Sequence, residues 1–242
     1  MNKFAGDLTI IYYTANYLEE VNPVFVANTK RQLLKAAARL PIISVSQKPM
    51  NFGENICVGP IGRHHLNIYR QILAGAKAAK TEYVAMAEDD ILYSYEHFHS
   101  FVPSGDEMLY DMNKLSIFTW TKTPVFSFRH NRMVINQLIA RRTVLVEALE
   151  ERFKRWPDDS KTPLHYWGDI GRYENHLGVT VRTRDNFMST CPSIVFTHPK
   201  AYGYEFNHGK RKRLGDLRIV EVPYWGRAED ILKWYTEPRE II

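Results

Sequence analysis

Short apolar runs and amphipathic segments alternate along the first hundred residues. Residues 7–14 form a run of β-branched and aromatic residues, which is typical of a buried strand. Two further apolar runs, 42–45 and 83–87, have the same character. Between these runs, apolar residues recur at helical spacing, first after Asn22-Pro23 and again over 66–76, which predicts two helices. The strand–helix–strand order predicts parallel pairing in an α/β sheet with helices on both faces.

The second half has a more mixed pattern. Amphipathic spacing predicts a helix over 143–156, and composition predicts loops at 48–62 and 157–163. Apolar runs predict further strands at the segments 114–120, 134–140, 178–183 and 193–196. No internal repeat or long linker divides the chain. We therefore expect a single α/β domain with a Rossmann-like mixed sheet.

Composition places the chain among globular proteins. Apolar residues make up 45% and charged residues 24% of the 242 positions, which argues against intrinsic disorder. The apolar runs are far shorter than the roughly 20 residues that span a bilayer, and no basic-then-apolar leader opens the chain. The two cysteines, Cys57 and Cys191, cannot form a disulfide framework. We expect a cytoplasmic protein with no transmembrane segment.

Positive charge is concentrated in the second half. The formal net charge is +5, of which +4 falls in 101–242. No acidic residue lies between Asp111 and Glu147, a stretch that holds Lys114, Lys122, Arg129, Arg132, Arg141 and Arg142. Four consecutive basic residues follow at 210–213. One such cluster is usually a solvated face, but two with aromatic residues between them favour a surface that binds a polyanion.

Three consecutive carboxylates, Glu88-Asp89-Asp90, come directly after the third predicted strand. Open α/β sheets bind ligands beyond the carboxyl ends of their strands. Hard cations such as Mg²⁺ and Mn²⁺ prefer oxygen ligands, and neighbouring carboxylates can hold a metal that bridges phosphates. The alternative is an acidic turn before a helix capped by Ser94. No Cys-x-x-Cys, P-loop or Gly-x-Gly-x-x-Gly motif is present, which removes the main support for a zinc ribbon, a P-loop NTPase or a dinucleotide-binding dehydrogenase.

The segment 62–90 resembles the core of the GT-A glycosyltransferases, especially their family 2-like group. In the order of that family it shows an Arg-containing loop, a helix that ends in small residues, Glu-Tyr-Val, a strand and an acidic motif. Glu88 stands where the family's motif has its first Asp. The resemblance covers about the first 93 residues well. It implies a single GT-A domain in which 1–100 bind a nucleotide sugar and 101–242 bind the acceptor.

The same resemblance implies a metal site. Asp90 would be a ligand of Mn²⁺ or Mg²⁺, and Glu88 or Asp89 would hold the ribose or belong to the metal shell. The family often adds a C-terminal ligand, commonly His. His198, in Thr-His-Pro after a predicted strand, is the better match, and His208 is the other option.

The donor implied by the resemblance is a nucleotide diphosphate sugar, with UDP as the expected nucleotide. Tyr13 and Thr14, at the end of the first predicted strand, would lie beside the nucleotide. Arg63, just before the helix of 66–76, would contact the pyrophosphate. These residues and the acidic motif would together form the donor site.

A carboxylate general base is also expected, because an acceptor hydroxyl must lose its proton as it attacks the anomeric carbon. The segment 166–178 resembles the family's region for this base. Asp169 is the first candidate and Glu174 its competitor, although Gly168 replaces the Glu of the family's motif. Without the resemblance, Asp169 would be interpreted as the N-cap of a following helix.

The basic second half favours a polyanionic acceptor. The overall pattern is similar to phage-type glycosyltransferases that modify 5-hydroxymethylated pyrimidines, such as 5-hydroxymethylcytosine, in DNA; a viral protein would then act in the host cytoplasm. Such an enzyme must flip the base out, bind phosphates and stack the base on an aromatic ring. The candidate residues for these contacts are Tyr202, Lys210, Arg211, Lys212 and Arg213. The alternatives are a saccharide or lipid-linked acceptor, and a non-catalytic nucleic-acid-binding domain of GT-A type.

Overall fold

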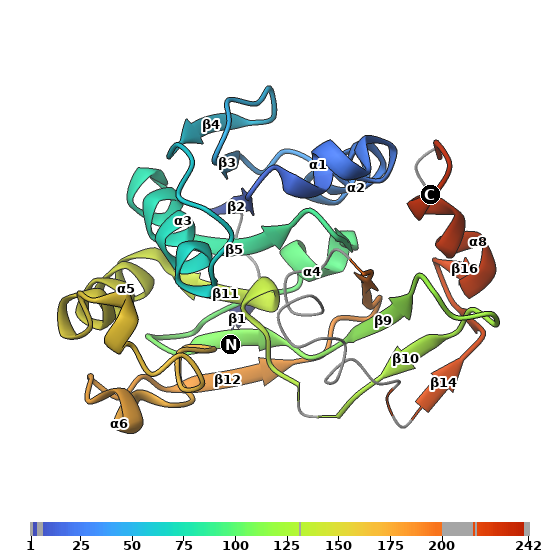
Figure 1. The fold of residues 1–242 in the computed structure, drawn as a ribbon. Helices are drawn as coiled ribbons and strands as arrows, with labels where there is room; N and C mark the ends of the chain where they lie inside the picture. Colours follow the sequence, from blue (N-terminus) through green and yellow to red (C-terminus); the bar gives the residue numbers. More distant parts are fainter. Residues whose placement is uncertain (1, 4–6, 131, 200–214, 216, 240–242) are drawn as a thin grey trace.

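The structure, a computed structural model, describes residues 2–3, 7–130, 132–199, 215 and 217–239 (Figure 1). Its larger sheet has seven strands. In spatial order they are β12 (Arg184–Phe187), β8 (Met108–Asp111), β11 (Leu138–Arg141), β5 (Tyr83–Glu88), β2 (Leu8–Thr14), β3 (Ile42–Ser46) and β4 (Glu54–Cys57). Strands from both halves of the chain therefore form one sheet.

The larger sheet is mixed, as predicted. β2 lies between β5 and β3 and runs parallel to both. β11 runs antiparallel to β5 and to β8. The register places Tyr13 of β2 directly opposite Glu88 of β5 at the carboxyl ends of the two strands. Residues 70 positions apart and more in the sequence thus meet at one edge of the sheet.

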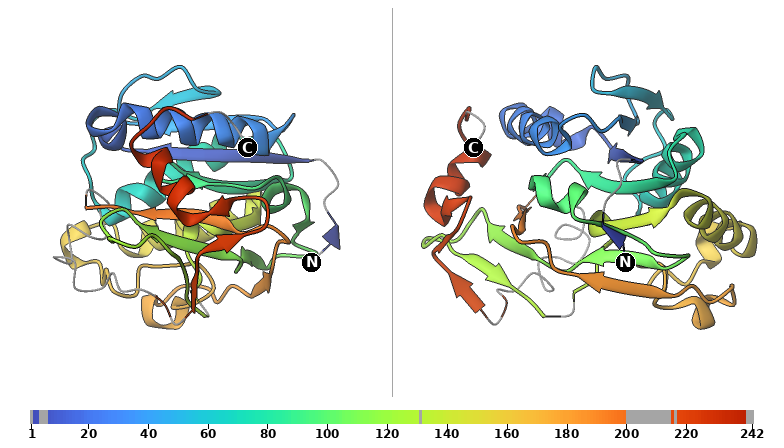
Figure 2. Two further views of the ribbon diagram at one scale, coloured as in Figure 1. Left: turned by 90° about the vertical axis from the view of Figure 1, so that its right-hand side faces the viewer. Right: turned by 180° about the vertical axis from the view of Figure 1, so that it is seen from behind.

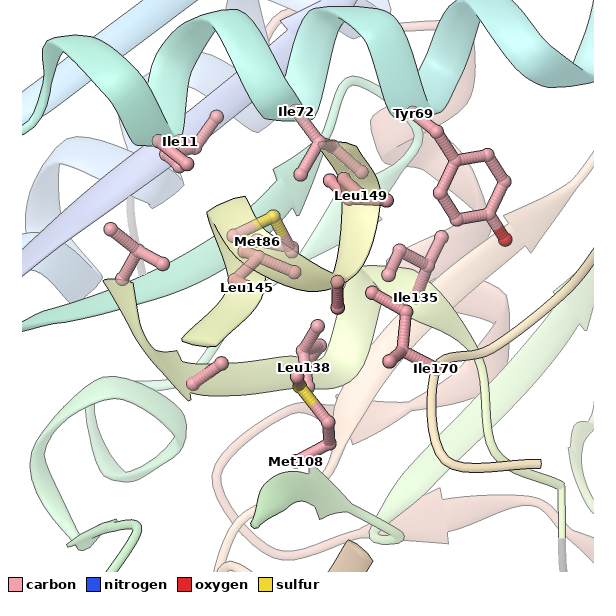
Figure 3. Packing of buried hydrophobic residues seen from close by; sticks show 14 of the residues in the cluster. Ile11, Tyr69, Ile72, Met86, Met108, Ile135, Leu138, Leu145, Leu149 and Ile170 are labelled. Carbon is pink, nitrogen blue, oxygen red and sulfur yellow. The ribbon is translucent and has the colours of Figure 1, made fainter. Parts of the chain in front are cut away.

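Helices cover both faces of this sheet, again as predicted. α3 (His65–Ala78) and α5 (Arg142–Arg155) pack on one face, against alternate strand residues such as Ile11 and Met86. Figure 3 shows Ile72 of α3 pointing toward Leu149 of α5, and Tyr69 pointing from the same helix into the cluster. On the opposite face lie α2 (Pro23–Ala37) and α4 (Tyr95–His99), which pack against the other alternate residues.

A second sheet, which the sequence did not predict, extends the molecule on one side. It consists of β14 (Leu217–Ile219), β10 (Phe126–Phe128), β9 (Lys114–Phe118), β13 (Ser193–Thr197) and β6 (Ile91–Leu92). The C-terminal helices α8 (Ala228–Leu232) and η3 (Lys233–Tyr235) lie beside α2 in Figure 2. Phe25 of α2 packs with this second sheet, whereas Leu33 of the same helix packs on the first. One helix joins both sheets, so the molecule is a single α/β domain.

The remaining elements are short. They are β1 (Asn2–Lys3), α1 (Tyr17–Val21), β7 (Phe101–Val102), η1 (Ile135–Gln137), η2 (Asp159–Lys161), α6 (Glu174–Leu177), β15 (Glu221–Val222) and β16 (Gly226–Arg227). Among the described residues, no helix has the length and apolar character that crossing a membrane requires.

Three predictions of secondary structure are corrected. The segment 134–140 begins as the 3-10 helix η1 and becomes a strand only at Leu138. The segment 178–183 is not a strand; Gly178 ends α6 in the left-handed conformation at φ 65°, and the strand β12 begins at Arg184. The predicted loop 48–62 contains β4. β4 and β12 are the two edge strands of the larger sheet and are partly exposed, so they lack the continuous apolar pattern of a buried strand.

Candidate active site

A cavity of about 640 Å³ opens at the carboxyl ends of β2 and β5. Its walls come from these strand ends, the start of α3, the beginning of β9, the segment 132–136, the loop 164–173 and His198. The structure brings eight of the residues proposed from the sequence into this cavity: Tyr13, Thr14, Arg63, Glu88, Asp89, Asp90, Asp169 and His198. They come from distant parts of the sequence, so the fold alone assembles them.

Glu88 is held by two hydrogen bonds. The hydroxyl of Tyr13 donates to Oε1 at 2.8 Å, and the side-chain amide of Asn136 donates to Oε2 at 2.6 Å. Tyr13 is available because it stands opposite Glu88 in the β2–β5 register. Asn136 lies in η1, where the sequence pattern suggested a strand, and no signal in the sequence marked it as a site residue. Both oxygens of Glu88 are therefore engaged by the protein.

Asp89 is fixed by the end of β2 and by α2. The hydroxyl of Thr14 donates to Asp89 Oδ2 at 2.6 Å, and Thr29 of α2 donates to its backbone carbonyl at 3.0 Å. Thr14 Oγ1 also accepts from the backbone N–H of Asn16 at 2.9 Å. Thr14 thus orients an acidic side chain of the cavity from its predicted position at the end of the first strand.

Asp90 differs from its two neighbours because one of its oxygens is uncommitted. Its Oδ1 is buried without a hydrogen-bond partner among the described residues. Its Oδ2 lies 3.7 Å from Nε2 of His198. Antiparallel pairing of β6 with β13 creates this proximity, and the backbone N–H of Phe196 donates to the Asp90 carbonyl at 2.9 Å. A carboxylate and an imidazole thus converge on one point of the cavity.

These two side chains suit a hard divalent cation. Mg²⁺ usually takes one or two protein carboxylates and completes its shell with waters and substrate phosphates. Imidazole is a suitable partner ligand for a transition metal such as Mn²⁺. Within the described part of the chain, no group of three or more His, Cys, Asp or Glu side chains is arranged to hold a metal by itself. Asp90 and His198 would therefore hold a cation only together with oxygens of a bound substrate or water.

The acidic cluster is electrostatically strained in a way that a cation relieves. Burial, followed by repulsion from Asp90, raises the pKa of Glu88 and raises the pKa of Asp89 to about 6. The hydrogen bonds from Tyr13 and Asn136 to Glu88, and from Thr14 to Asp89, act in the opposite direction but do not compensate. Adjacent carboxylates at low solvent exposure favour a nearby positive charge.

The start of α3 forms a second wall of the cavity. Arg63 and His64 precede the helix, and the His64 side chain caps it by accepting from the N–H of Leu66 at 3.3 Å. The Arg63 guanidinium lies 3.9 Å from the centre of the Tyr17 ring. Gly62 has φ 81° and exchanges two 2.9 Å hydrogen bonds with the Gln47 side chain. A helix N-terminus with an arginine beside it is a favourable place for phosphate oxygens.

Asp169 lies on the opposite side, in the loop between η2 and α6. The alternative role as an N-cap is wrong, because α6 begins only at Glu174 with Tyr173 at the N-cap position. Burial raises the pKa of Asp169 to about 6, although Arg172 and Lys114 lower it. Arg172 Nη1 is 3.9 Å from Asp169 Oδ2, beyond hydrogen-bond distance. The carboxylate is thus accessible to the cavity and more basic than an ordinary aspartate.

Glu174, the competing candidate for the base, lies outside the lining of the cavity. Its side chain is 4% exposed and accepts from Arg152 at 2.7 Å, in a buried ion pair. The same oxygen accepts from the backbone N–H of Gly171 at 2.6 Å. Arg152 also donates to the Gly168 carbonyl at 2.8 Å, so the pair supports the loop that carries Asp169.

Several candidate residues lie outside the described part of the chain. They are His208, the alternative metal ligand, and the proposed DNA contacts Tyr202, Lys210, Arg211, Lys212 and Arg213. Conversely, sequence reasoning overlooked three cations that line the cavity, namely Lys114, Arg132 and Arg172. Lys114 and Arg132 stood out only as members of the stretch without acidic residues. Their position in the cavity depends on the second sheet.

No family model and no curated protein matches this chain. Among solved structures, it is similar to TarS of S. aureus, with 12% identity and a TM-score of 0.45 over 82% of this chain and 38% of that chain. A glycosyltransferase involved in glycosylation of the major capsid of PBCV-1 has 8% identity and a TM-score of 0.46, over 85% of this chain and 99% of that chain. Drosophila beta-1,4-galactosyltransferase 7, in a mutant complex with manganese, UDP-Gal and xylobiose, has 15% sequence identity and a TM-score of 0.41. The match covers 88% of this chain and 78% of that chain.

These likenesses are distant, because every identity is 15% or less and every TM-score is below 0.5. The chain spans little more than a third of the TarS chain.

Proposed function

We propose that this protein is a GT-A-type glycosyltransferase that moves a sugar from a nucleotide diphosphate sugar to a hydroxyl acceptor with the help of a divalent metal. The observation that carries the proposal is the pairing of two chemistries in one cavity of about 640 Å³. Asp90 presents a buried, unpartnered oxygen beside His198 on one side. Asp169, a partly buried carboxylate of raised pKa, lies on another. Glycosyl transfer needs both functions.

The donor would occupy the side formed by β2, β5 and α3. Tyr13 and Thr14 position Glu88 and Asp89 next to the place proposed for the nucleotide. The start of α3 and Arg63 suit the pyrophosphate. A Mn²⁺ or Mg²⁺ ion held by Asp90 and His198 would offset the charge of the leaving pyrophosphate. UDP remains the nucleotide that we propose.

Asp169 would act as the general base. The acceptor oxygen forms a bond to the anomeric carbon while the bond between that carbon and the pyrophosphate oxygen breaks. The proton of the acceptor hydroxyl passes to the Asp169 carboxylate. A base is most effective when its pKa lies near the working pH, so the raised pKa of Asp169, about 6, favours this role over that of an ordinary aspartate.

A 5-hydroxymethylated pyrimidine in DNA stays the predicted acceptor. Aromatic side chains suited to stacking a flipped base, His165 and Tyr173, line the cavity near Asp169. These rings serve a sugar acceptor equally well, so a saccharide remains the alternative. The basic residues predicted to contact DNA phosphates lie outside the described residues.

The test is a donor screen followed by a transfer assay. Purified protein with Mn²⁺ is incubated with UDP-, GDP- and TDP-sugars, and release of the nucleoside diphosphate is measured. We expect release from one donor class, dependent on metal and lost in Asp90→Asn. The matched control is Asp106→Asn, because Asp106 is a surface aspartate whose side chain is 77% exposed.

Transfer of the labelled sugar is then measured with DNA that contains 5-hydroxymethylcytosine or 5-hydroxymethyluracil, and with oligosaccharides. Labelled DNA supports the predicted acceptor, and labelled saccharide supports the alternative. If no donor is cleaved with any metal, the proposal of glycosyl transfer is rejected and a non-catalytic role takes its place.

A further inference from the structure

Three cations surround Asp169 in the cavity: Lys114 at the start of β9, Arg132, and Arg172 in the loop before α6. They come from three separate segments and face the acceptor side. The general base needs at most one cation to orient it. The surplus of positive charge therefore calls for another explanation.

Lys114 is buried, with 8% exposure, yet it has no carboxylate within ion-pair distance among the described residues. Its ammonium group donates to the backbone carbonyl of Arg132, which ties the two cations together. Asp111, which also attracts Lys114, is already committed, since it binds His97 at 2.9 Å and accepts from two backbone N–H groups. Burial, then repulsion from Arg132, lowers the pKa of Lys114 to about 8. A buried ammonium in this state gains from a bound anion.

Arg132 shows the same imbalance. Its guanidinium makes no hydrogen bond or ion pair with any described residue, while burial and the neighbouring Arg129 lower its pKa. Arg172 lies over the Tyr173 ring at 4.8 Å and reaches Asp169 only at 3.9 Å. Three cations thus gather around Asp169, the carboxylate that lines this side of the cavity among the described residues.

The donor does not account for these cations. Attraction from Asp169 counters the lowered pKa of Arg132, and attraction from Asp111 and then Asp169 counters that of Lys114. Among the described residues, neither cation forms an ion pair with the acidic cluster at 88–90, whose Asp90 lies instead near His198. The pyrophosphate has its own place at the start of α3, with Arg63 and the metal ligands. The surplus charge therefore belongs to the acceptor.

We propose that Lys114, Arg132 and Arg172 form a subsite for the oxyanion of a phosphate ester, so that the acceptor carries a phosphate close to the hydroxyl that is glycosylated. This inference rests on the proposed function, because it assumes that the acceptor binds beside Asp169. Guanidinium groups match phosphate oxygens in pairs, and a lysine adds a point charge. A nucleic-acid phosphodiester and a small sugar phosphate share this chemistry.

The test measures binding with UDP and Mn²⁺ present in excess, so that the donor side is occupied. The probes are hexathymidylate, glucose 6-phosphate and glucose, and titration calorimetry gives each dissociation constant. We expect binding of at least one phosphate ester, weakened about tenfold in Arg132→Gln and in Arg172→Gln. Glucose should not bind measurably. Comparing the dissociation constants of hexathymidylate and glucose 6-phosphate distinguishes a nucleic-acid phosphodiester from a small sugar phosphate.

Two exposed cations away from the cavity provide matched controls, Lys154→Gln and Arg218→Gln, which should bind the ester as the wild type does. Lys114→Gln is tested as well, and a thermal melt shows whether this variant folds, because the Lys114 side chain is buried. If it does not fold, the two arginine variants decide the result. Equal binding of glucose and its phosphate, no binding of either ester, or unchanged binding in both arginine variants would overturn the subsite. Release of the nucleotide from the donor is measured in a separate assay. If the protein binds the phosphate ester at this subsite but cleaves no donor, the proposed function is rejected and the subsite is retained.

Discussion

The two sides of the cavity are built in different ways. The acidic side rests on the carboxyl ends of parallel strands β2 and β5, and on β6 paired with β13, so strand pairing fixes Glu88 and Asp90, and two threonine hydroxyls hold Asp89 between them. The Asp169 side rests on a loop that is supported by one buried ion pair, Arg152–Glu174. The acidic side is therefore positioned by strand pairing, and the Asp169 side by side-chain contacts to a loop, which include the hydrogen bond from the Tyr110 hydroxyl to the Ile170 carbonyl at 2.9 Å.

This difference suits an enzyme with one kind of donor and a variable acceptor. Metal and pyrophosphate chemistry requires fixed ligands, which strand ends supply. Acceptor recognition varies among enzymes and is commonly carried by loops on a rigid scaffold. Substitutions on the acidic side should therefore abolish donor chemistry, whereas those near Asp169 should affect proton transfer, acceptor binding and stability separately.

The largest effect is expected from Asp90→Asn. The substitution removes the charge that would hold the cation, and metal stabilisation of a leaving group contributes several kcal/mol. We expect metal-dependent release of the nucleoside diphosphate to fall by roughly 10³-fold. Steady-state kinetics over a range of Mn²⁺ concentrations measures the loss.

The neighbouring variant Asp89→Asn serves as a comparison for Asp90→Asn. Asp89 is engaged by Thr14 and by α2, whereas Asp90 Oδ1 has no partner among the described residues. Asp89→Asn should reduce the rate by only about tenfold, the loss of one charged contact. Equal losses in both variants would contradict the assignment of Asp90 as the principal ligand.

The acidic side was largely predictable from the sequence. A β-branched run, a helix and a second run imply parallel strands, and parallel strands bring their carboxyl ends to one edge. Thr14, Tyr13 and the triplet 88–90 therefore had to lie close together. The sequence also placed His198 after a strand, but only the pairing of β6 with β13 brings it to Asp90.

The other side was less predictable, for physical reasons. Asp169 was identified through a resemblance, since a loop without periodicity gives no local signal. Asn136 lies in η1, where apolar residues suggested a strand. Lys114 lines the cavity because β9, which it begins, pairs with the distant strand β13 in the second sheet, and Arg132 follows β10 of the same sheet. Such pairing between distant segments leaves no short-range pattern.

The second largest effect is expected from Asp169→Asn. Loss of a general base typically reduces the rate by at least about a hundredfold. The variant should bind donor and Mn²⁺ as the wild type does, because Asp169 lies on the side of the cavity that we propose for the acceptor. Transfer kinetics, with donor binding measured in parallel, distinguish a loss of proton transfer from a loss of donor binding.

Glu174→Gln should behave in the opposite way. It leaves the Arg152 guanidinium, 1% exposed, without its charged partner, and breaking a buried ion pair costs about 3 kcal/mol. We therefore expect a lower melting temperature with transfer largely retained below it. A fully folded Glu174→Gln protein without activity, beside an active Asp169→Asn protein, would reverse the assignment of the base.

A smaller effect is expected from pH. The pKa of Asp169 is raised to about 6, chiefly by burial, and only its deprotonated form accepts a proton. The rate of transfer should therefore be level above pH 7 and fall about tenfold per pH unit below about pH 6. The profile of kcat between pH 4.5 and 8.5 tests this, and a profile that is flat down to pH 5 would contradict it.

The smallest effect concerns stability and comes from the same carboxylate. Because its folded pKa, about 6, lies above the unfolded value of 3.8, the folded state holds the proton more tightly, and stability is lost as pH rises from 4 through 6. Asp169→Asn removes this cost, so the variant should be more stable than the wild type at pH 7.5, by on the order of 2 kcal/mol or a few degrees in Tm.

Most of that gain should disappear at pH 4, where Asp169 is protonated in the folded protein. Thermal melts of both proteins at pH 7.5 and pH 4 measure the difference, and a pH-independent change would show that Asp169 is not the titrating group. The deficit of Glu174→Gln should persist at pH 7.5, because it comes from the lost ion pair with Arg152. At pH 7.5 we therefore expect Asp169→Asn to raise the stability and Glu174→Gln to lower it. Stability changes of opposite sign would distinguish a carboxylate with a chemical role from one with a structural role.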